Sequence, residues 1–96
     1  MAQYFWQETV ADKVRIGLTA SAQETFGQIK FADLPQIGRQ VTVGKPFLAI
    51  EAEKAVLDLD APLSGQIVAV NTRAADDPAL LDSTAKTDNW VAEIKA

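Results

Sequence analysis

The hydrophobic positions of the chain fall into short runs of Val, Ile, Leu and Phe that are separated by polar residues, Gly and Pro. Several runs alternate apolar and polar residues, which is typical of β-strands with one face on a core. Strands bounded by turn residues at this spacing favour an all-β sandwich or barrel. The pattern predicts seven strands, at residues 14–18, 28–32, 40–43, 46–52, 55–59, 66–70 and 90–94.

Two short helical segments are expected between the strands. Ser21 can cap a helix over residues 22–26, and Gly27 follows it as a stop signal. Asp77 and Pro78 can open a helical turn that continues to Leu81. We therefore expect one or two short helices in a fold that otherwise consists of strands.

A loose internal repeat relates residues 33–44 to residues 60–71, at an offset of 27 positions. Both copies follow the pattern Asp-x-Pro-x-x-Gly-x-x-Val-x-Val, and they end in Gly44 and Asn71. Pro presets φ, Gly accepts a positive φ, and a final Gly or Asn suits a left-handed turn position. The repeat predicts two similar β-units that pack face to face around an approximate two-fold axis.

Lys54 falls between two predicted strands, at the tip of a tight polar hairpin. Flanking strands satisfy their own main-chain hydrogen bonds and hold such a lysine out in water. The repeat offset pairs Lys54 with Gly27, which predicts that these positions lie at opposite ends of the body. The long side chain gives an attached group reach and a high local concentration. A lysine that only solubilises the turn is the alternative.

Length and composition restrict the function. The 96 residues predict one domain over residues 1–96, and the net charge of −4 without a basic run argues against a nucleic-acid partner. The chain has no His and no Cys, which removes the commonest catalytic bases, thiol nucleophiles and zinc ligands. No apolar run is long enough to span a membrane, and the N-terminus lacks a signal-peptide pattern. We expect a cytoplasmic protein that is not an enzyme and has no membrane partner.

The sequence around Lys54 resembles a known modification hairpin. Glu-Ala-Glu-Lys-Ala, followed by Ala-Pro-Leu-Ser-Gly at residues 61–65, is similar to the lipoylation hairpin of glycine cleavage H-proteins and of acyltransferase lipoyl domains. The H-protein pattern Glu-Ser-Val-Lys-Ala is matched at three positions and departed from at two. The matches are Glu51, Lys54 and Ala55, and the departures are Ala52 and Glu53. Glu53 is closer to the acidic residue that precedes the lysine of acyltransferase domains.

The rest of the chain favours the H-protein family. The resemblance covers residues 4–95, and a helical segment between Ser21 and Phe26 would be absent from an acyltransferase lipoyl domain. Matching segments follow in the same order and spacing, at Trp6 and at residues 16–19, 22–24, 26–29, 34–38, 70–71, 78–81 and 89–90.

This resemblance implies both a fold and a role. The implied fold is a barrel-sandwich hybrid of two antiparallel sheets with quasi two-fold symmetry. The implied cofactor is lipoate, attached covalently to Lys54, which would shuttle aminomethyl or acyl groups, reducing equivalents or the lipoyl group itself. The implied partners are a lipoate-protein ligase or lipoyl transferase and the lipoyl-dependent enzymes aminomethyltransferase, glycine decarboxylase and dihydrolipoyl dehydrogenase. These proteins would recognise Glu51, Ala52, Glu53 and Ala55.

Two features depart from the family pattern. Tyr4 stands where H-proteins usually have His, and the chain ends at Ala96, where many H-proteins continue into a helix. Both suit a short H-protein-like carrier with a lipoyl-relay or stress role, for which the family implies ADP-ribosylating or de-modifying enzymes as further partners. One alternative is a biotinyl carrier, in which Met would flank the lysine in place of Glu53 and Ala55. Another is an unmodified interaction module in a stress-response operon.

Overall fold

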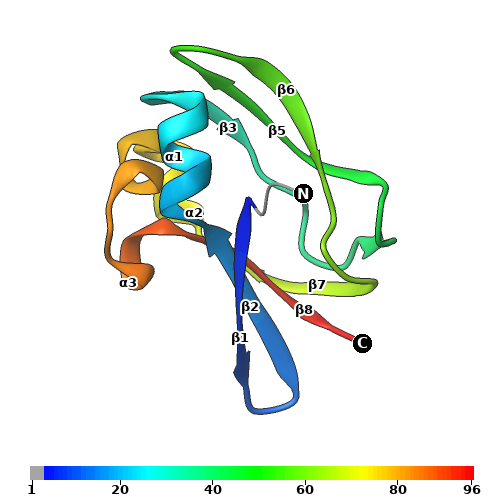
Figure 1. The fold of residues 1–96 in the computed structure, drawn as a ribbon. Helices are drawn as coiled ribbons and strands as arrows, with labels where there is room; N and C mark the ends of the chain where they lie inside the picture. Colours follow the sequence, from blue (N-terminus) through cyan, green and yellow to red (C-terminus); the bar gives the residue numbers. More distant parts are fainter. Residues whose placement is uncertain (1–3) are drawn as a thin grey trace.

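The computed structural model describes residues 4–96 and shows two packed antiparallel sheets with short helices along one side (Figure 1). The five-stranded sheet has the order β1-β2-β8-β7-β4, and the three-stranded sheet has the order β3-β5-β6. The strands are β1 (Phe5–Val10), β2 (Lys13–Leu18), β3 (Ile29–Asp33), β4 (Gln40–Val41), β5 (Pro46–Ala52), β6 (Val56–Asp60), β7 (Gly65–Val70) and β8 (Trp90–Lys95). The helices are α1 (Ala20–Phe26), α2 (Thr72–Asp76), α3 (Lys86–Asn89) and the 3-10 helix η1 (Pro78–Asp82).

One core holds the two sheets and the helices together. Its largest fully buried side chains come from both sheets and from two helices, and they are Ile16, Leu18, Phe26, Ile29, Leu48, Ile50, Ile67, Leu81, Val91 and Ile94. Each such side chain contributes about 1.5–3 kcal/mol when it is removed from water. The sheets pack on each other without closing into a barrel. This arrangement confirms the predicted barrel-sandwich hybrid.

All seven predicted strands are present, with bounds that differ by at most two residues. Strand β1 was not predicted. It lies at the edge of its sheet, and Gln7, Glu8 and Thr9 in its middle are all exposed. Because no alternating apolar face develops in an edge strand of this kind, its sequence carries no period-two signal.

The described residues contain more helix than the one or two short helices predicted. Helices α2 and α3 have five and four residues, and neither has a side-chain cap at its N-terminus. The usual start signal is therefore missing from the sequence. Helix α1 is capped by Thr19 and not by Ser21: the Thr19 hydroxyl accepts a hydrogen bond from the Ala22 N–H at 3.1 Å.

The internal repeat is visible in the strands. Strands β3 and β6 begin and end 27 residues apart, and both pair with β5. The same offset thus extends to strands that precede the two copies: β3 and β6 lie in one sheet, while β4 and β7, within the copies, lie in the other. The copies themselves meet side by side, where Gln40 of β4 pairs with Gln66 of β7.

The last position of the repeat differs between the copies. Gly44 has φ +83, as predicted, but Asn71 has φ −80, so the left-handed turn predicted at Asn71 is wrong. Asn71 has a different role: it is 3% exposed, and its side-chain amide donates to the carbonyls of Asp88 at 2.9 Å and Trp90 at 3.0 Å. The amide side chain, not the backbone freedom of asparagine, explains this residue.

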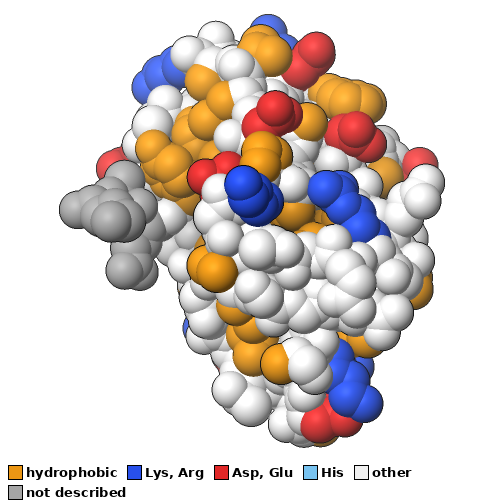
Figure 2. Space-filling view, turned by 90° about the vertical axis from the view of Figure 1, so that its right-hand side faces the viewer, with side chains coloured by type: hydrophobic (Ala, Val, Ile, Leu, Met, Phe, Trp, Pro, Cys, Tyr) orange, Lys and Arg blue, Asp and Glu red, His pale blue; other side chains and the backbone are white. Residues whose placement is uncertain are grey.

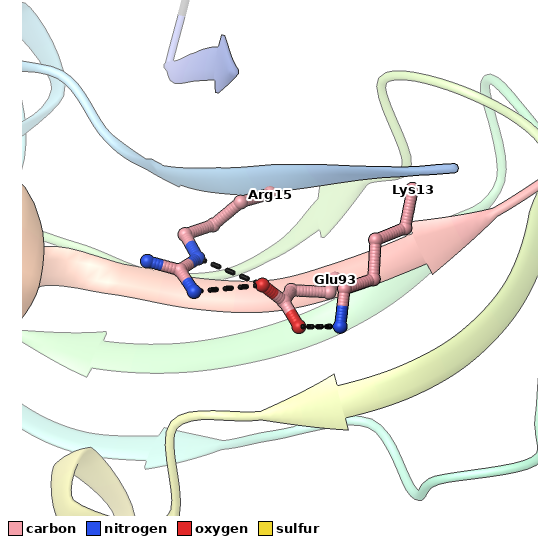
Figure 3. Close-up of polar contacts among 3 residues, drawn as sticks. All are labelled: Lys13, Arg15 and Glu93. Atoms are coloured by element: carbon pink, nitrogen blue, oxygen red, sulfur yellow. Dashed lines mark hydrogen bonds and ion pairs between the residues drawn. The ribbon is translucent and has the colours of Figure 1, made fainter. Parts of the chain in front are cut away.

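A buried carboxylate links β2 and β8 (Figure 3). Glu93 of β8 is 4% exposed and lies between Lys13 and Arg15 of β2, at 2.9 Å and 2.8 Å. Burial alone would raise the pKa of Glu93, but the hydrogen bonds and positive charges of Lys13 and Arg15 outweigh burial and hold that pKa below its usual value. Arg15 also lies over the ring of Trp90, 5.0 Å from its centroid. The Trp90 ring thus packs against a side chain of the neighbouring strand β2.

Candidate functional site

Lys54 lies in the turn between β5 and β6. The hairpin that these two strands form has its tip at one end of the molecule (Figure 1). The Ala52 N–H donates to the Ala55 carbonyl at 2.7 Å, and the Ala55 N–H donates to the Ala52 carbonyl at 3.4 Å. These bonds close a loop of only two residues, Glu53 and Lys54, whose side chains are both exposed. The lysine therefore occupies the hairpin tip predicted from the sequence.

The tip rests on the segment that connects α1 to β3. The Lys54 N–H donates to the Phe26 carbonyl and the Glu53 N–H donates to the Gln28 carbonyl, each at 2.9 Å. The Lys54 ammonium donates to the Glu24 carbonyl at 3.3 Å. Carbonyls in the last turn of a helix lack intrahelical partners and carry partial negative charge, so a cation is favoured there.

Gly27 lies directly beneath the tip, not at the opposite end of the body as the repeat offset predicted. A Cβ atom built on Gly27 would lie 3.4 Å from Cγ of Lys54 and 2.8 Å from Oε1 of Glu53. The prediction was wrong because α1 precedes β3 and brings its C-terminal end to the β5–β6 hairpin, and no matching helix precedes β6. Sequence reasoning identified Gly27 as a helix stop and as the repeat partner of Lys54, but not as its neighbour in space.

Acidic residues lie on the elements next to the lysine tip. The half-buried Asp82 of η1 accepts the Ile29 N–H at 3.1 and 3.2 Å. Burial raises the pKa of Asp82, and the nearby negative charge of Glu53 adds to this, although the hydrogen bond from Ile29 acts in the opposite direction. Glu24 is exposed in the last turn of α1.

The four residues that flank the lysine differ in their surroundings. Ala52 and Ala55 are half-buried and pack against the core, so they anchor the base of the tip. Glu53 is exposed, and its carboxylate lies 3.4 Å from the Gln28 N–H. Glu51 is exposed on the outer face of the three-stranded sheet.

The surroundings of Glu51 form a mixed apolar and acidic surface. Glu51 pairs with Phe31 on one side and with Val56 on the other. Phe31 is 50% exposed and Val56 is 77% exposed, and a hollow of about 280 Å³ lies beside them with Asp33 and Asp58 in its lining. Figure 2 shows apolar side chains interspersed with acidic and basic ones on the upper part of one face of the molecule.

The chemistry available at the tip is that of one reachable amine. Within residues 4–96 no three carboxylate, His or Cys side chains converge into a metal site. Within the same residues, no helix has the length and apolar character needed to cross a membrane. An exposed primary amine on a short hairpin can accept an acyl group from a partner enzyme and carry it away from the surface.

Two open antiparallel sheets with a lysine at the tip of a two-residue hairpin define a protein of the lipoyl-domain-like barrel-sandwich class. Comparison with known proteins narrows this class. The family model for the glycine cleavage H-protein matches residues 1–96. The chain belongs to the glycine cleavage H-protein family.

Individual relatives agree with this assignment. The chain is 40% identical over 90 residues to the mitochondrial glycine cleavage system H protein of Mesembryanthemum crystallinum. This match covers 94% of this chain and 55% of that relative. It is 38% identical over 90 residues to a probable glycine cleavage system H protein of Haloarcula marismortui, covering 94% of this chain and 71% of the relative. The chain thus spans about half the length of the first relative.

A solved structure supports the same fold. The crystal structure of a glycine cleavage system H protein from Mycobacterium marinum matches 99% of this chain and 80% of that chain, with a TM-score of 0.86 and 37% sequence identity. At that level of identity the similarity concerns both sequence and fold.

Proposed function

We propose that this protein is a lipoyl carrier that receives lipoate on Lys54 and serves glycine cleavage or a related lipoyl relay. Membership of the H-protein family supports this role. The observation that carries the proposal is the exposed position of Lys54 at a two-residue hairpin tip, where a second enzyme can reach the amine from solvent. A cytoplasmic location is part of the proposal.

The surroundings of the lysine fit an amide-linked group. The ammonium makes a hydrogen bond of 3.3 Å to the Glu24 carbonyl at the surface. Acylation removes the positive charge but leaves one N–H on the nitrogen, which can still donate to that carbonyl. The bond formed is therefore compatible with the contact that the free lysine makes.

Four neighbouring residues are the proposed recognition elements for the modifying enzyme and the partners. Ala52 and Ala55 keep the turn narrow, because a larger side chain at either position would have to fit against the core. Glu51 and Glu53 add two exposed carboxylates to the chain just before the lysine. A modifying enzyme with a basic surface would be attracted to this arrangement.

The proposed partners are a lipoate-protein ligase or lipoyl transferase and the enzymes that use the arm, namely aminomethyltransferase, glycine decarboxylase and dihydrolipoyl dehydrogenase. ADP-ribosylating or de-modifying enzymes are further proposed partners. When attached, the lipoyl group supplies the thiol–disulfide and group-transfer chemistry. The protein itself presents the arm, fixes its point of attachment and offers a docking surface beside it.

The intact mass of the protein tests the proposal. Wild type, Lys54→Arg and Lys45→Arg are incubated with a lipoate ligase, lipoate and ATP. Lys45 is a matched control because it is an exposed lysine in the connection between β4 and β5. We expect one lipoyl group on wild type and on Lys45→Arg, and none on Lys54→Arg.

The same assay distinguishes the alternatives. A chain that gains biotin in place of lipoate, when both are offered with their ligases, is a biotinyl carrier. A chain that gains neither group is an interaction module that keeps the fold without the modification. Lipoylation that persists in Lys54→Arg would move the site to another lysine.

A further inference from the structure

We propose that Gly27 is a positioning residue for Lys54, and that the α1–β3 connection forms a seat which fixes the point where the lysine leaves the protein. The seat consists of Phe26, Gly27 and Gln28. This inference rests on the proposed function, because positioning matters only if Lys54 is modified. Gly27 is far from Lys54 in the sequence and lies next to it only in the folded protein.

The hairpin turn cannot hold its shape by turn chemistry alone. Two-residue hairpin loops usually adopt turns with positive φ, whose twist matches that of the strands, and they prefer Asn or Gly. The loop here is Glu53-Lys54, and among residues 4–96 the only non-glycine residue with a positive φ is Ala11. A loop of this kind splays its strands unless another part of the chain supports it.

The seat supplies that support. Both N–H groups of the loop donate to carbonyls of the seat, from Lys54 to Phe26 and from Glu53 to Gln28, each at 2.9 Å. The seat itself is firmly held: Phe26 is 1% exposed, and its ring packs against Tyr4 with centroids 5.0 Å apart. The main chain of the lysine is thus tied to the core and not only to its own hairpin.

Only glycine fits at the centre of the seat. Gly27 has φ +74 and ψ −157, a backbone conformation that is almost restricted to glycine. A Cβ atom at this position would also lie 3.1 Å from Cβ of Glu53 and 2.8 Å from Oε1 of Glu53. Any side chain at Gly27 therefore pushes the tip away and lengthens the two hydrogen bonds that hold it.

The consequence concerns the enzyme that modifies the lysine. A docked tip presents the lysine main chain in one place, so the enzyme does not have to order the loop when it binds. A tip released from its seat must be ordered in the complex, which weakens binding before the chemical step begins. We therefore expect the loss in KM and not in kcat.

The test compares Gly27→Ala with Gly44→Ala. Both substitutions place alanine at a positive φ, +74 and +83, but nothing lies within 4 Å of a Cβ at Gly44. Hydrogen exchange of the Glu53 and Lys54 amides is measured together with the kinetics of lipoyl transfer, at a temperature where thermal unfolding shows both variants to be folded. For Gly27→Ala we expect faster exchange at these two amides and a KM roughly tenfold higher, whereas Gly44→Ala matches wild type.

Wild-type exchange and KM in Gly27→Ala would overturn the proposal, as would an equal rise of KM in Gly44→Ala. If Gly27→Ala does not fold, Glu53→Pro and Glu53→Ala decide. Proline suits the second position of a turn but removes the N–H that donates to Gln28. If the seat positions the lysine, KM is higher for Glu53→Pro than for Glu53→Ala; equal KM values would overturn the proposal. If wild type accepts no lipoyl group, the proposed function fails. The seat is then tested only by whether the Glu53 and Lys54 amides exchange faster in Gly27→Ala than in wild type.

Discussion

Glu93 shows how a single residue connects charge to stability. Its side chain is 5% exposed, while those of its partners Lys13 and Arg15 remain 32% and 31% exposed. Lys13 and Arg15 can therefore be solvated if the carboxylate loses its charge, whereas an ionised carboxylate at this depth is strongly destabilising without them. The pair of cations is the reason that an ionised group is tolerated inside the sheet.

The pH dependence of unfolding follows from the lowered pKa of Glu93. Because the pKa is lower in the folded state than in the unfolded state, the contribution is complete above the usual glutamate value of about 4.3 and is lost as pH falls through the folded pKa. We expect Glu93→Gln to lower the free energy of unfolding by about 1–3 kcal/mol at pH 7. The difference from wild type should vanish in acid.

Urea unfolding between pH 7 and pH 3 measures this difference. Glu8→Gln is the control, because the Glu8–Lys86 ion pair is long, at 3.5 Å, and about half exposed on both sides. Such surface pairs contribute about 0–1 kcal/mol. A gap between Glu93→Gln and wild type that stays constant down to pH 3 would contradict the titration argument.

At the scale of elements, the last positions of the two repeat copies, Gly44 and Asn71, stabilise the fold in different ways. Gly44 is needed for its backbone conformation, while Asn71 is needed for its side chain, which binds the carbonyls of Asp88 and Trp90 just before and at the start of β8. The sequence pattern treats these positions as interchangeable. The structure separates them.

An exchange of these residues tests the distinction. Gly44→Asn should be tolerated, because asparagine adopts a positive φ and the space around Gly44 is open. Asn71→Gly should lower the free energy of unfolding by about 1–3 kcal/mol, because it removes the buried amide that donates to two part-buried carbonyls. Thermal or urea unfolding of both variants gives the answer. An equal loss of stability in the two variants would contradict the distinction between the positions.

The elements also show where sequence reasoning ends. The pattern of apolar residues located β5 without error, because buried Phe47, Leu48 and Ile50 form a strong apolar run between turn residues. It located Lys54 at a hairpin tip for the same reason. It could not find the contact between Gly27 and Lys54, because that contact depends on how α1 packs beside a hairpin 25 residues later. Tertiary contacts of this kind leave no periodic signal.

At the scale of the whole molecule, β8 holds the larger sheet together. It pairs with β2 on one side and with β7 on the other, and Val91, Ala92 and Ile94 have no exposed surface. Removing it would expose this part of the core and leave two strands with unpaired edges. Few other segments combine so many main-chain bonds with so much burial.

A chain cut after Asn89 should therefore not fold. Two fully buried aliphatic side chains contribute about 1.5–3 kcal/mol each, and the lost ladders on both sides bring the total close to the 5–15 kcal/mol of a typical domain. Circular dichroism and NMR dispersion measure the outcome. A chain that lacks only Ala96 is the control and should remain folded. A cooperative unfolding transition in the shorter chain would refute the central role of β8.

The position of Lys54 in the smaller sheet has a consequence for breathing motions. The hairpin tip is tied to the seat by two main-chain hydrogen bonds, whereas β8 is locked between two neighbours in the other sheet. Local opening of the tip needs far less free energy than opening of the larger sheet. Local opening at the lysine loop can thus occur while the larger sheet stays closed, so that fluctuations of the tip do not expose the core to proteases.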